Sequence, residues 1–340
     1  LLSLASSVNF SQGLTEYDTT GFLPVFPDDK VEVFIDGQPV LNGWVDATNP
    51  SFGPSSHNFK VSGRSKACDL VDCSDPKSKN QWKNIGLKSL ITELIKPWDI
   101  VLASTPADLG ADFKKFSSEP GSTVFDTINK ACTLRGVLPI SNPDGSISLI
   151  QAGAKKSFDS LVGGVNVTSG TGNFNYSDRF SEYTVRGQQA FPKAGQASKN
   201  QTISVEATTI DQDVKRYRPK VIIAGSEVDQ DSAQDRADWE ATTRAGKSSA
   251  VNLKTTSWTQ SNGVLWTVGD LSPVEVKRLG IKEELLITTV KFAYGSGGET
   301  AELTVMRKDS FLKLAKGKKN KKVKPKQDPW AKVREDIRNG

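Results

Sequence analysis

Hydrophobic and polar residues alternate over residues 31–63, with the period of two that half-buried β-strands show. Val31, Val33 and Ile35 share one face of the first strand. An Asp-Gly pair at 36–37 then signals a tight hairpin, because Gly accepts the positive φ that such a turn requires. The pattern predicts three antiparallel strands typical of a small barrel or sandwich, at residues 31–35, 40–47 and 58–62.

A weaker copy of this pattern lies about 240 residues downstream, at residues 274–309. Both segments begin Val-Glu-Val, continue with a strand, cross a turn rich in Gly and Ser, and end in an alternating strand. Hairpins with such turns are common, so the pattern alone leaves two interpretations open: a chance match, or two quasi-equivalent modules. Two such modules in one chain favour a protein that assembles into a ring over one that turns over a substrate.

The hydrophobic spacing becomes helical between these two segments. Residues 84–96 place Leu and Ile at helical intervals, and a proline ends the helix. A second helix is predicted over residues 122–135, with Ser122 as its N-cap and Gly136 just past its C-terminus. A short hairpin with an Asn-Pro-Asp-Gly turn follows. We therefore predict an α+β unit over residues 75–159.

The second half of the chain mixes strands with one further helix. We predict strands at residues 166–188, 220–224, 250–259 and 264–268, a helix at 231–245, and a mobile polar loop at 189–201.

Length and composition allow two or three soluble domains in a chain of 340 residues. The sequence lacks the run of about 18 apolar residues that would predict a transmembrane helix. Its first residues carry neither Met nor a basic flank, so we expect a chain that begins inside a β-structure, with upstream residues missing. Cys68, Cys73 and Cys132 form no CxxC pair, and we expect three free thiols; a single bridge between Cys68 and Cys73 remains an alternative.

The net formal charge of +5 is concentrated near the C-terminus. Residues 313–326 contain eight Lys and no acidic residue, so the rest of the chain carries about three net negative charges. This Lys-rich tail is interpreted as a solvated linker. The alternative is an electrostatic tether to nucleic acid or to an acidic protein.

Motifs for enzymatic chemistry are missing from the sequence. There is one histidine, His57, and neither a G-x-S-x-G elbow nor an HExxH motif. Glycine-rich segments lack the Lys-Ser/Thr that completes a phosphate-binding loop, and they fit turns instead. We predict no catalytic residue, no cofactor and no metal site.

A group of acidic residues is the strongest alternative to this prediction. Asp69 and Asp72 are close in sequence, and Asp75 follows. Paired carboxylates could hydrolyse a glycosidic bond, which would make the chain a cell-wall-degrading tail hydrolase. Exposed Asp where a strand ends is more often a cap or turn former, and we favour that interpretation.

Several longer segments together resemble one protein family. The most specific are DRFSEYTVRGQ at residues 178–188 and SGRSKACDLVDCS at residues 62–74, supported by VEVFIDGQPVLNGWVDA, QWKNIGLKSLITELIKPW and NGVLWTVGDLSPVEV. In these segments, which follow one another in the family's order, the chain resembles the baseplate hub proteins of contractile-tailed phages, most closely the Mu-type hub.

The resemblance implies an α+β, mostly β chain with two quasi-equivalent small β-barrel domains and an inserted α+β domain. It implies a homotrimer whose pseudo-sixfold ring joins the tail tube to the membrane-piercing spike, with no enzymatic activity. The implied domains are residues 1–74 plus 160–190 for the first barrel, 75–159 for the insertion, 191–312 for a helix and the second barrel, and 313–340 for the tail.

The resemblance also implies the partners and location of the chain. These are other copies of itself, the central spike, and the tail tube or a tube initiator, with the Lys-rich tail available to a tape-measure or another baseplate protein. The expected location is the virion baseplate, after assembly in the host cytoplasm. A hub of a tailocin or of a type VI-like injection device is a related alternative.

Overall fold

A computed structural model describes residues 7–14, 25–54, 56–75, 80–190, 202–223, 230–295 and 298–311. The Lys-rich tail, most of the predicted loop at 189–201 and the first six residues lie outside this part of the chain. The chain divides into two compact units, Leu1–Gln151 and Ala152–Gly340, which are described separately.

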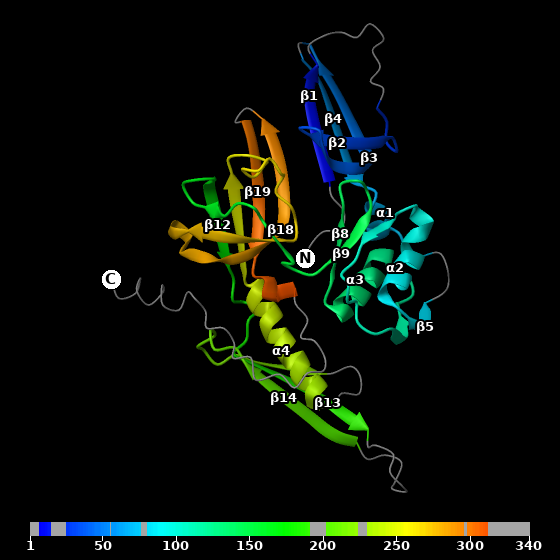
Figure 1. The fold of residues 1–340 in the computed structure, drawn as a ribbon, viewed down its shortest axis with the longest axis vertical. Coiled ribbons are helices and arrows are strands. Elements are labelled where there is room, and N and C mark those ends of the chain that lie inside the picture. The colour runs from blue at the N-terminus through cyan, green and yellow to red at the C-terminus, as the bar shows by residue number, and fades with distance from the viewer. Residues whose placement is uncertain are drawn as a thin grey trace. The chain divides into compact units, whose positions relative to one another are not determined.

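The first unit opens with a four-stranded antiparallel sheet, here called the N-terminal sheet (Figure 1). Asp36 and Gly37 form its first turn with positive φ angles of 48° and 76°, which confirms the predicted hairpin. The three predicted strands are present, and the second continues well beyond residue 47. The sheet has the order β1-β4-β3-β2, with bounds β1 (Ser7–Leu14), β2 (Lys30–Ile35), β3 (Gln38–Gly53) and β4 (Ser56–Ser65).

The rest of the first unit contains the predicted α+β segment up to Gln151, and the last residues of that prediction, to residue 159, fall in the second unit. Its strands form two small sheets, β5-β7 and β6-β9-β8, beside three helices. The elements are α1 (Cys68–Asp72), β5 (Gln81–Ile85), α2 (Leu87–Ile95), η1 (Lys96–Trp98), β6 (Leu102–Ser104), β7 (Phe113–Ser117), α3 (Val124–Arg135), β8 (Leu138–Ser141) and β9 (Ile147–Ile150).

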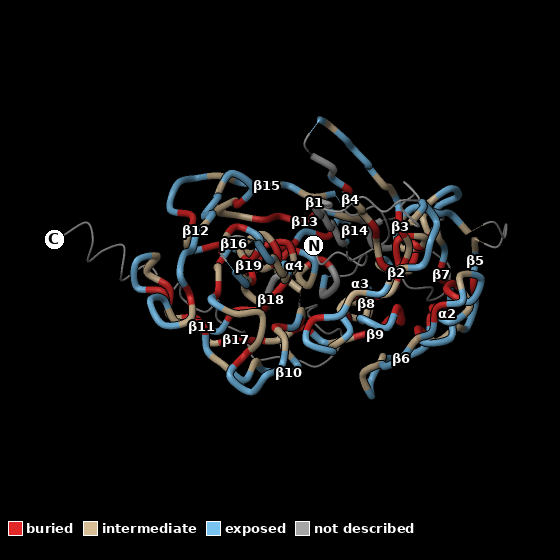
Figure 2. The backbone as a smooth tube through the Cα atoms, turned by 90° about the horizontal axis from the view of Figure 1, so that it is seen from above, coloured by how far each residue is buried: buried red, intermediate tan, exposed pale blue. Residues whose placement is uncertain are grey.

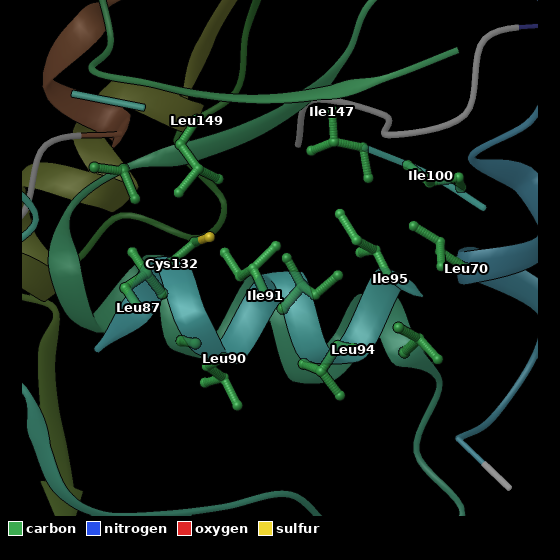
Figure 3. Packing of buried hydrophobic residues seen from close by; sticks show 14 of the residues in the cluster. Leu70, Leu87, Leu90, Ile91, Leu94, Ile95, Ile100, Cys132, Ile147 and Leu149 are labelled. Carbon is green, nitrogen blue, oxygen red and sulfur yellow. The ribbon is translucent and has the colours of Figure 1, made fainter. Parts of the chain in front are cut away.

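Helix α2 supplies the centre of this unit's core. Buried and exposed residues alternate along it with helical spacing (Figure 2). Figure 3 shows its apolar side chains beside Ile147 and Leu149 of β9 and Cys132 of α3. Burial of each such side chain stabilises the fold by about 1.5–3 kcal/mol. The buried residues of α2 are Leu87, Leu90, Ile91, Leu94 and Ile95.

Helix α3 (Val124–Arg135) has its N-cap one residue later than predicted. Thr123, rather than Ser122, is the N-cap: its Oγ1 accepts the Asp126 N–H, and the Asp126 carboxylate accepts the Thr123 N–H. Ser122 instead donates its hydroxyl to the Glu119 carbonyl. Gly136 ends the helix in the left-handed conformation, as the sequence predicted.

The second unit contains a seven-stranded sheet with its own hydrophobic core. The order is β10-β17-β18-β19-β16-β12, and β11 also pairs with β17. The strands β16–β19 within it are called the C-terminal sheet. The bounds are β10 (Lys155–Lys156), β11 (Leu161–Val162), β12 (Val167–Phe174), β16 (Ser249–Thr255), β17 (Asp270–Val276), η2 (Lys277–Leu279), β18 (Ile281–Gly295) and β19 (Gly298–Met306).

The predicted strand at residues 264–268 is wrong. Only a single bridge joins Thr259 to Leu265, because the chain turns back on itself at Gln260 and Gly263. The segment still serves the core: Trp266 is 4% exposed and packs with the C-terminal sheet. The hydrophobic pattern of residues 264–268 thus predicted correctly that the segment contributes to the core, but it predicted a strand where the chain forms a loop.

A three-stranded sheet and the long helix α4 complete the second unit. Ala233 and Ala237 of the helix pack on Val185, Val205 and Ala207 of the sheet, and small side chains allow this close contact. The order is β14-β13-β15, with bounds β13 (Glu182–Ala190), β14 (Thr202–Ile210), β15 (Pro219–Ile223) and α4 (Gln230–Lys247), before η3 (Lys308–Phe311).

The chain is thus an α+β protein dominated by strands. Residues 160–190 differ from the domain grouping expected above: β11 pairs with β17, β12 with β16, and β13 with β14 and β15. The hydrogen-bonded partners of this segment are therefore in the second unit rather than in residues 1–74. Among the described residues, neither large sheet closes into a barrel.

Candidate interaction sites

The N-terminal and C-terminal sheets share one topology. In chain order each has four antiparallel strands, and in space the first strand lies beside the fourth, giving β1-β4-β3-β2 and β16-β19-β18-β17. The fourth strand of each sheet therefore lies between its first and third strands. This arrangement connects strands that are far apart in the sequence, so it goes beyond the likeness of two local hairpins.

The long hairpin of each sheet also has the same register. Gly53 pairs with Ser56 and Gly295 pairs with Gly298, so each turn holds two residues. A bulge residue, Asp46 or Thr288, lies seven positions before the glycine that precedes the turn. A bulge at the same place in both hairpins bends both sheets at the same point.

The first strands of the two sheets align as well. Ser7 lies opposite Arg64, and Ala250 lies opposite Met306, which is the matching position of the other hairpin. From there β1 reads Val-Asn-Phe and β16 reads Val-Asn-Leu. Sequence reasoning missed this match, because β1 and β16 lie outside the two segments it compared.

The Val-Glu-Val sequences that first suggested the repeat are not structurally equivalent. Val33 lies opposite Leu41, and Val274 lies opposite Glu283. Measured from the bulges, Leu41 and Glu283 occupy the same position, so Val33 corresponds to Val274. Alignment of the two Val-Glu-Val sequences matches Val31 with Val274, which is two residues out of register but keeps each side chain on the same face.

Both hairpins present an exposed aromatic side chain at the tip. Phe52 is 88% exposed and Tyr294 is 78% exposed, and each immediately precedes the glycine of its turn. Between residues 46 and 60, and between residues 291 and 299, the sequence contains no Asp, Glu, Lys or Arg. Isolated exposed apolar residues are ordinary, so what distinguishes these two is their equivalent position in the two hairpins.

The acidic residues considered for catalysis have structural roles. Asp72 forms an ion pair with Arg64 at 2.8 Å, and Arg64 also forms an ion pair with the bulge residue Asp46. The Asp69 carboxylate accepts a hydrogen bond from the Cys68 thiol, and the Asp69 backbone carbonyl accepts one from the Cys73 N–H. Asp72 thus ties α1 to Arg64 of the N-terminal sheet, and Asp69 makes its hydrogen bonds within α1.

The remaining sequence candidates do not form a metal or thiol site. No group of three or more His, Cys, Asp or Glu residues in the described segments could hold a metal ion. His57 is in β4. The three cysteines are free, as expected; burial raises the pKa of Cys68 to about 11 and that of Cys132 to about 12, while Cys73 is exposed.

A buried ion-pair network joins the seven-stranded sheet to the three-stranded one. Arg179 is 3% exposed and binds both oxygens of Asp211 and one of Asp213, each at 2.8–2.9 Å. Burial alone would lower the pKa of Arg179, but the hydrogen bonds to Asp211 and Asp213 outweigh it and raise the pKa. Arg179 also lies over the ring of Tyr176 and contacts Ser248, the residue before β16. Its position in the specific DRFSEYTVRGQ segment gives that sequence a physical role.

A polar pocket of about 220 Å³ lies next to this network. Its lining includes Arg244 and Lys247 from the end of α4 and Asn173 from β12. Arg244 is already paired with Asp178 at 2.5 Å and with Glu240 at 3.0 Å. We assign no ligand to this pocket. Separately, no helix in the described segments is long and apolar enough to cross a membrane.

Four family models match in order along the chain: Mu phage baseplate assembly protein GpP-like, N-terminal (residues 2–65); baseplate hub protein gp44-like, second domain (67–151); tail protein NMB1110-like, third domain (179–239); and Mu phage baseplate assembly protein GpP, fourth domain (229–314). The chain belongs to the Mu-type baseplate hub family.

Individual relatives agree with this assignment. The chain is 31% identical to baseplate hub protein gp44 of Escherichia phage Mu, over 92% of this chain and 84% of the relative. The crystal structure of the 43 kDa tail protein of prophage MuSo2 from Shewanella oneidensis is similar with a TM-score of 0.80 and 28% identity, over 91% of this chain and 92% of that one. A tail protein from Neisseria meningitidis MC58 has the same fold, with a TM-score of 0.75 and 21% identity, over 91% of each chain.

Proposed function

We propose that this chain is the structural hub of a contractile phage baseplate. Three copies form a ring in which N-terminal and C-terminal sheets alternate, so that a threefold assembly presents six similar positions. The ring joins the sixfold tail tube to the threefold central spike. The observation that carries this proposal is the shared strand order, register and bulge of two sheets about 240 residues apart.

The physical logic is one of symmetry matching. A homotrimer with two equivalent modules per chain offers six equivalent contacts on one side and three on the other. In this proposal residues 1–74 and residues 191–312 each supply one ring module, residues 75–159 form the insertion, and each sheet is completed into a barrel-like module in the assembly. In this proposal the Lys-rich tail binds a tape-measure or another baseplate protein, and assembly takes place in the host cytoplasm before the hub enters the virion.

Oligomeric state tests the proposal directly. Light scattering of the full chain at micromolar concentration should give a mass three times that of the monomer. Electron-microscope projections along the ring axis should show six similar lobes around a central channel. A monomer at every concentration tested, or a trimer with three dissimilar pairs of lobes, would contradict the proposed assembly.

A non-enzymatic role is part of the same proposal. Its support is the commitment of Asp69 and Asp72 to α1 and to Arg64, which leaves the acid pair with a structural purpose. A tailocin or type VI-like device would use the same ring with a different cargo. Identification of the neighbouring genes would separate these settings.

A further inference from the structure

The two exposed aromatic residues at the hairpin tips point to a specific contact. We propose that Phe52 and Tyr294 are paired anchors that insert into one kind of apolar pocket, repeated around the end of the tail tube. This inference rests on the proposed hub function and adds to it the residues and the partner that make the contact.

The equivalence of the two anchors follows from strand register. Both residues lie six positions after the bulge and immediately before the turn glycine, as the pairing of Gly53 with Ser56 and of Gly295 with Gly298 establishes. They are therefore the same structural position in two copies of one module. The residue type agrees as well, since each is an aromatic residue followed by the Gly that precedes the two-residue turn.

The chemistry of the tips suits an interface core. Aromatic side chains dominate the energetic centres of protein interfaces, and charged residues are depleted there. Each tip combines an aromatic side chain with a flanking segment that lacks acidic and basic residues. The Tyr294 ring has one fixed neighbour: the Trp258 ring lies 5.9 Å from it, and Trp258 donates its indole N–H to the carbonyls of Ala293 and Thr300. A preorganised anchor loses less entropy on binding.

Symmetry selects the tube over the spike as the partner. Two equivalent anchors in each chain require a partner that offers the same pocket at least twice per chain. Six copies of a tube protein around the ring provide six pockets for the six tips of a trimer. A threefold spike provides three, so only Phe52 or only Tyr294 could be engaged by it.

Binding of the full chain to purified tube protein tests the inference. The variants are Phe52→Ser, Tyr294→Ser and the double variant, and the controls are Phe158→Ser and Tyr217→Ser, which remove aromatic residues that are 69% and 81% exposed and lie outside the two hairpins. Each tip variant should weaken binding to assembled tube rings at least about tenfold, as expected for truncation of an interface hot spot. The double variant should weaken it further, and the controls should stay within about twofold of the parent chain.

The outcomes separate this inference from the hub proposal. If the parent chain is trimeric and binds tube rings but both tip variants behave like the controls, the anchor inference is overturned and the hub stands. Loss at only one tip, or loss of binding to purified spike protein instead of tube rings, also overturns it. A parent chain that is monomeric, or that binds no tube rings, overturns the hub proposal and this inference together. Unchanged melting temperatures show that the variants are folded.

Discussion

The N-terminal and C-terminal sheets have the same topology but different surroundings. The C-terminal sheet is extended by β10 and β11 at one side and by β12 at the other, and it belongs to a cluster of thirteen buried hydrophobic residues. Where burial is described, the N-terminal sheet contributes to none of the hydrophobic clusters, although Leu41 and Val45 are buried. The same strand topology thus occurs once with a large hydrophobic cluster of its own and once with only a few buried residues.

The two sheets also differ in how they join their neighbours. Arg179 connects the C-terminal side to the three-stranded sheet through a buried network, whereas Arg64 connects the N-terminal sheet to α1 through exposed ion pairs. Burial makes such a network costly to disrupt, while water screens an exposed pair. The connection made by Arg179 is therefore expected to be more rigid than the connection made by Arg64.

The largest loss of stability is expected when the buried network around Arg179 is broken. Arg179→Met leaves Asp211 and Asp213 without their partner, and a broken buried pair destabilises by about 3–5 kcal/mol. Urea denaturation measures the loss. Arg186→Met is the matched control, because its pair with Glu206 is exposed and contributes about 0–1 kcal/mol. Similar losses in the two variants would refute a structural role for the network.

Core truncation compares the two sheets themselves. Leu303→Ala in the C-terminal sheet and Leu41→Ala in the N-terminal sheet remove the same atoms from buried positions. Such changes cost about 2–5 kcal/mol, and the cost grows with the cavity that remains. Because Leu303 lies within the hydrophobic cluster, its loss should fall at the upper end and that of Leu41 at the lower end. The reverse order, measured from urea midpoints, would show that the N-terminal sheet has the stronger core.

A smaller loss of stability is expected when the exposed ion pairs of Arg64 are removed. Arg64→Ala removes the ion pairs with Asp46 and Asp72, which are screened by solvent, and should lower the free energy of unfolding by at most about 1 kcal/mol. The loss should shrink further at 1 M salt. A loss as large as that of Arg179→Met would remove the contrast between the two connections.

The purified chain is expected not to degrade the bacterial cell wall. The purified chain should leave peptidoglycan gels uncleared, and Asp69→Asn and Asp72→Asn should behave like the parent chain. Clearing by the parent that disappears in either variant would make α1 a hydrolytic site and would end the non-enzymatic interpretation.

Local patterns predicted most individual elements but not their partners. The helices α2 and α3 and the Asp36-Gly37 turn follow from spacing and caps, which depend on neighbours a few residues away. The segment at residues 264–268 failed because an apolar residue is equally compatible with a strand and with a buried loop. The anchor residues Phe52 and Tyr294 were visible as Phe-Gly and Tyr-Gly pairs, but nothing in the sequence fixed their shared position.

Sequence patterns predicted the class of the protein: a mostly β chain with an α+β insertion, two related hairpins and the features of a baseplate hub. Which strands pair, and in what register, is seen only in the folded sheets. There β12 lies beside β16, the repeat aligns two residues away from the match of the Val-Glu-Val sequences, and β1 corresponds to β16. The physical reason is that strand pairing satisfies backbone hydrogen bonds between distant segments, and an alternating pattern fits several registers equally well until the whole sheet forms.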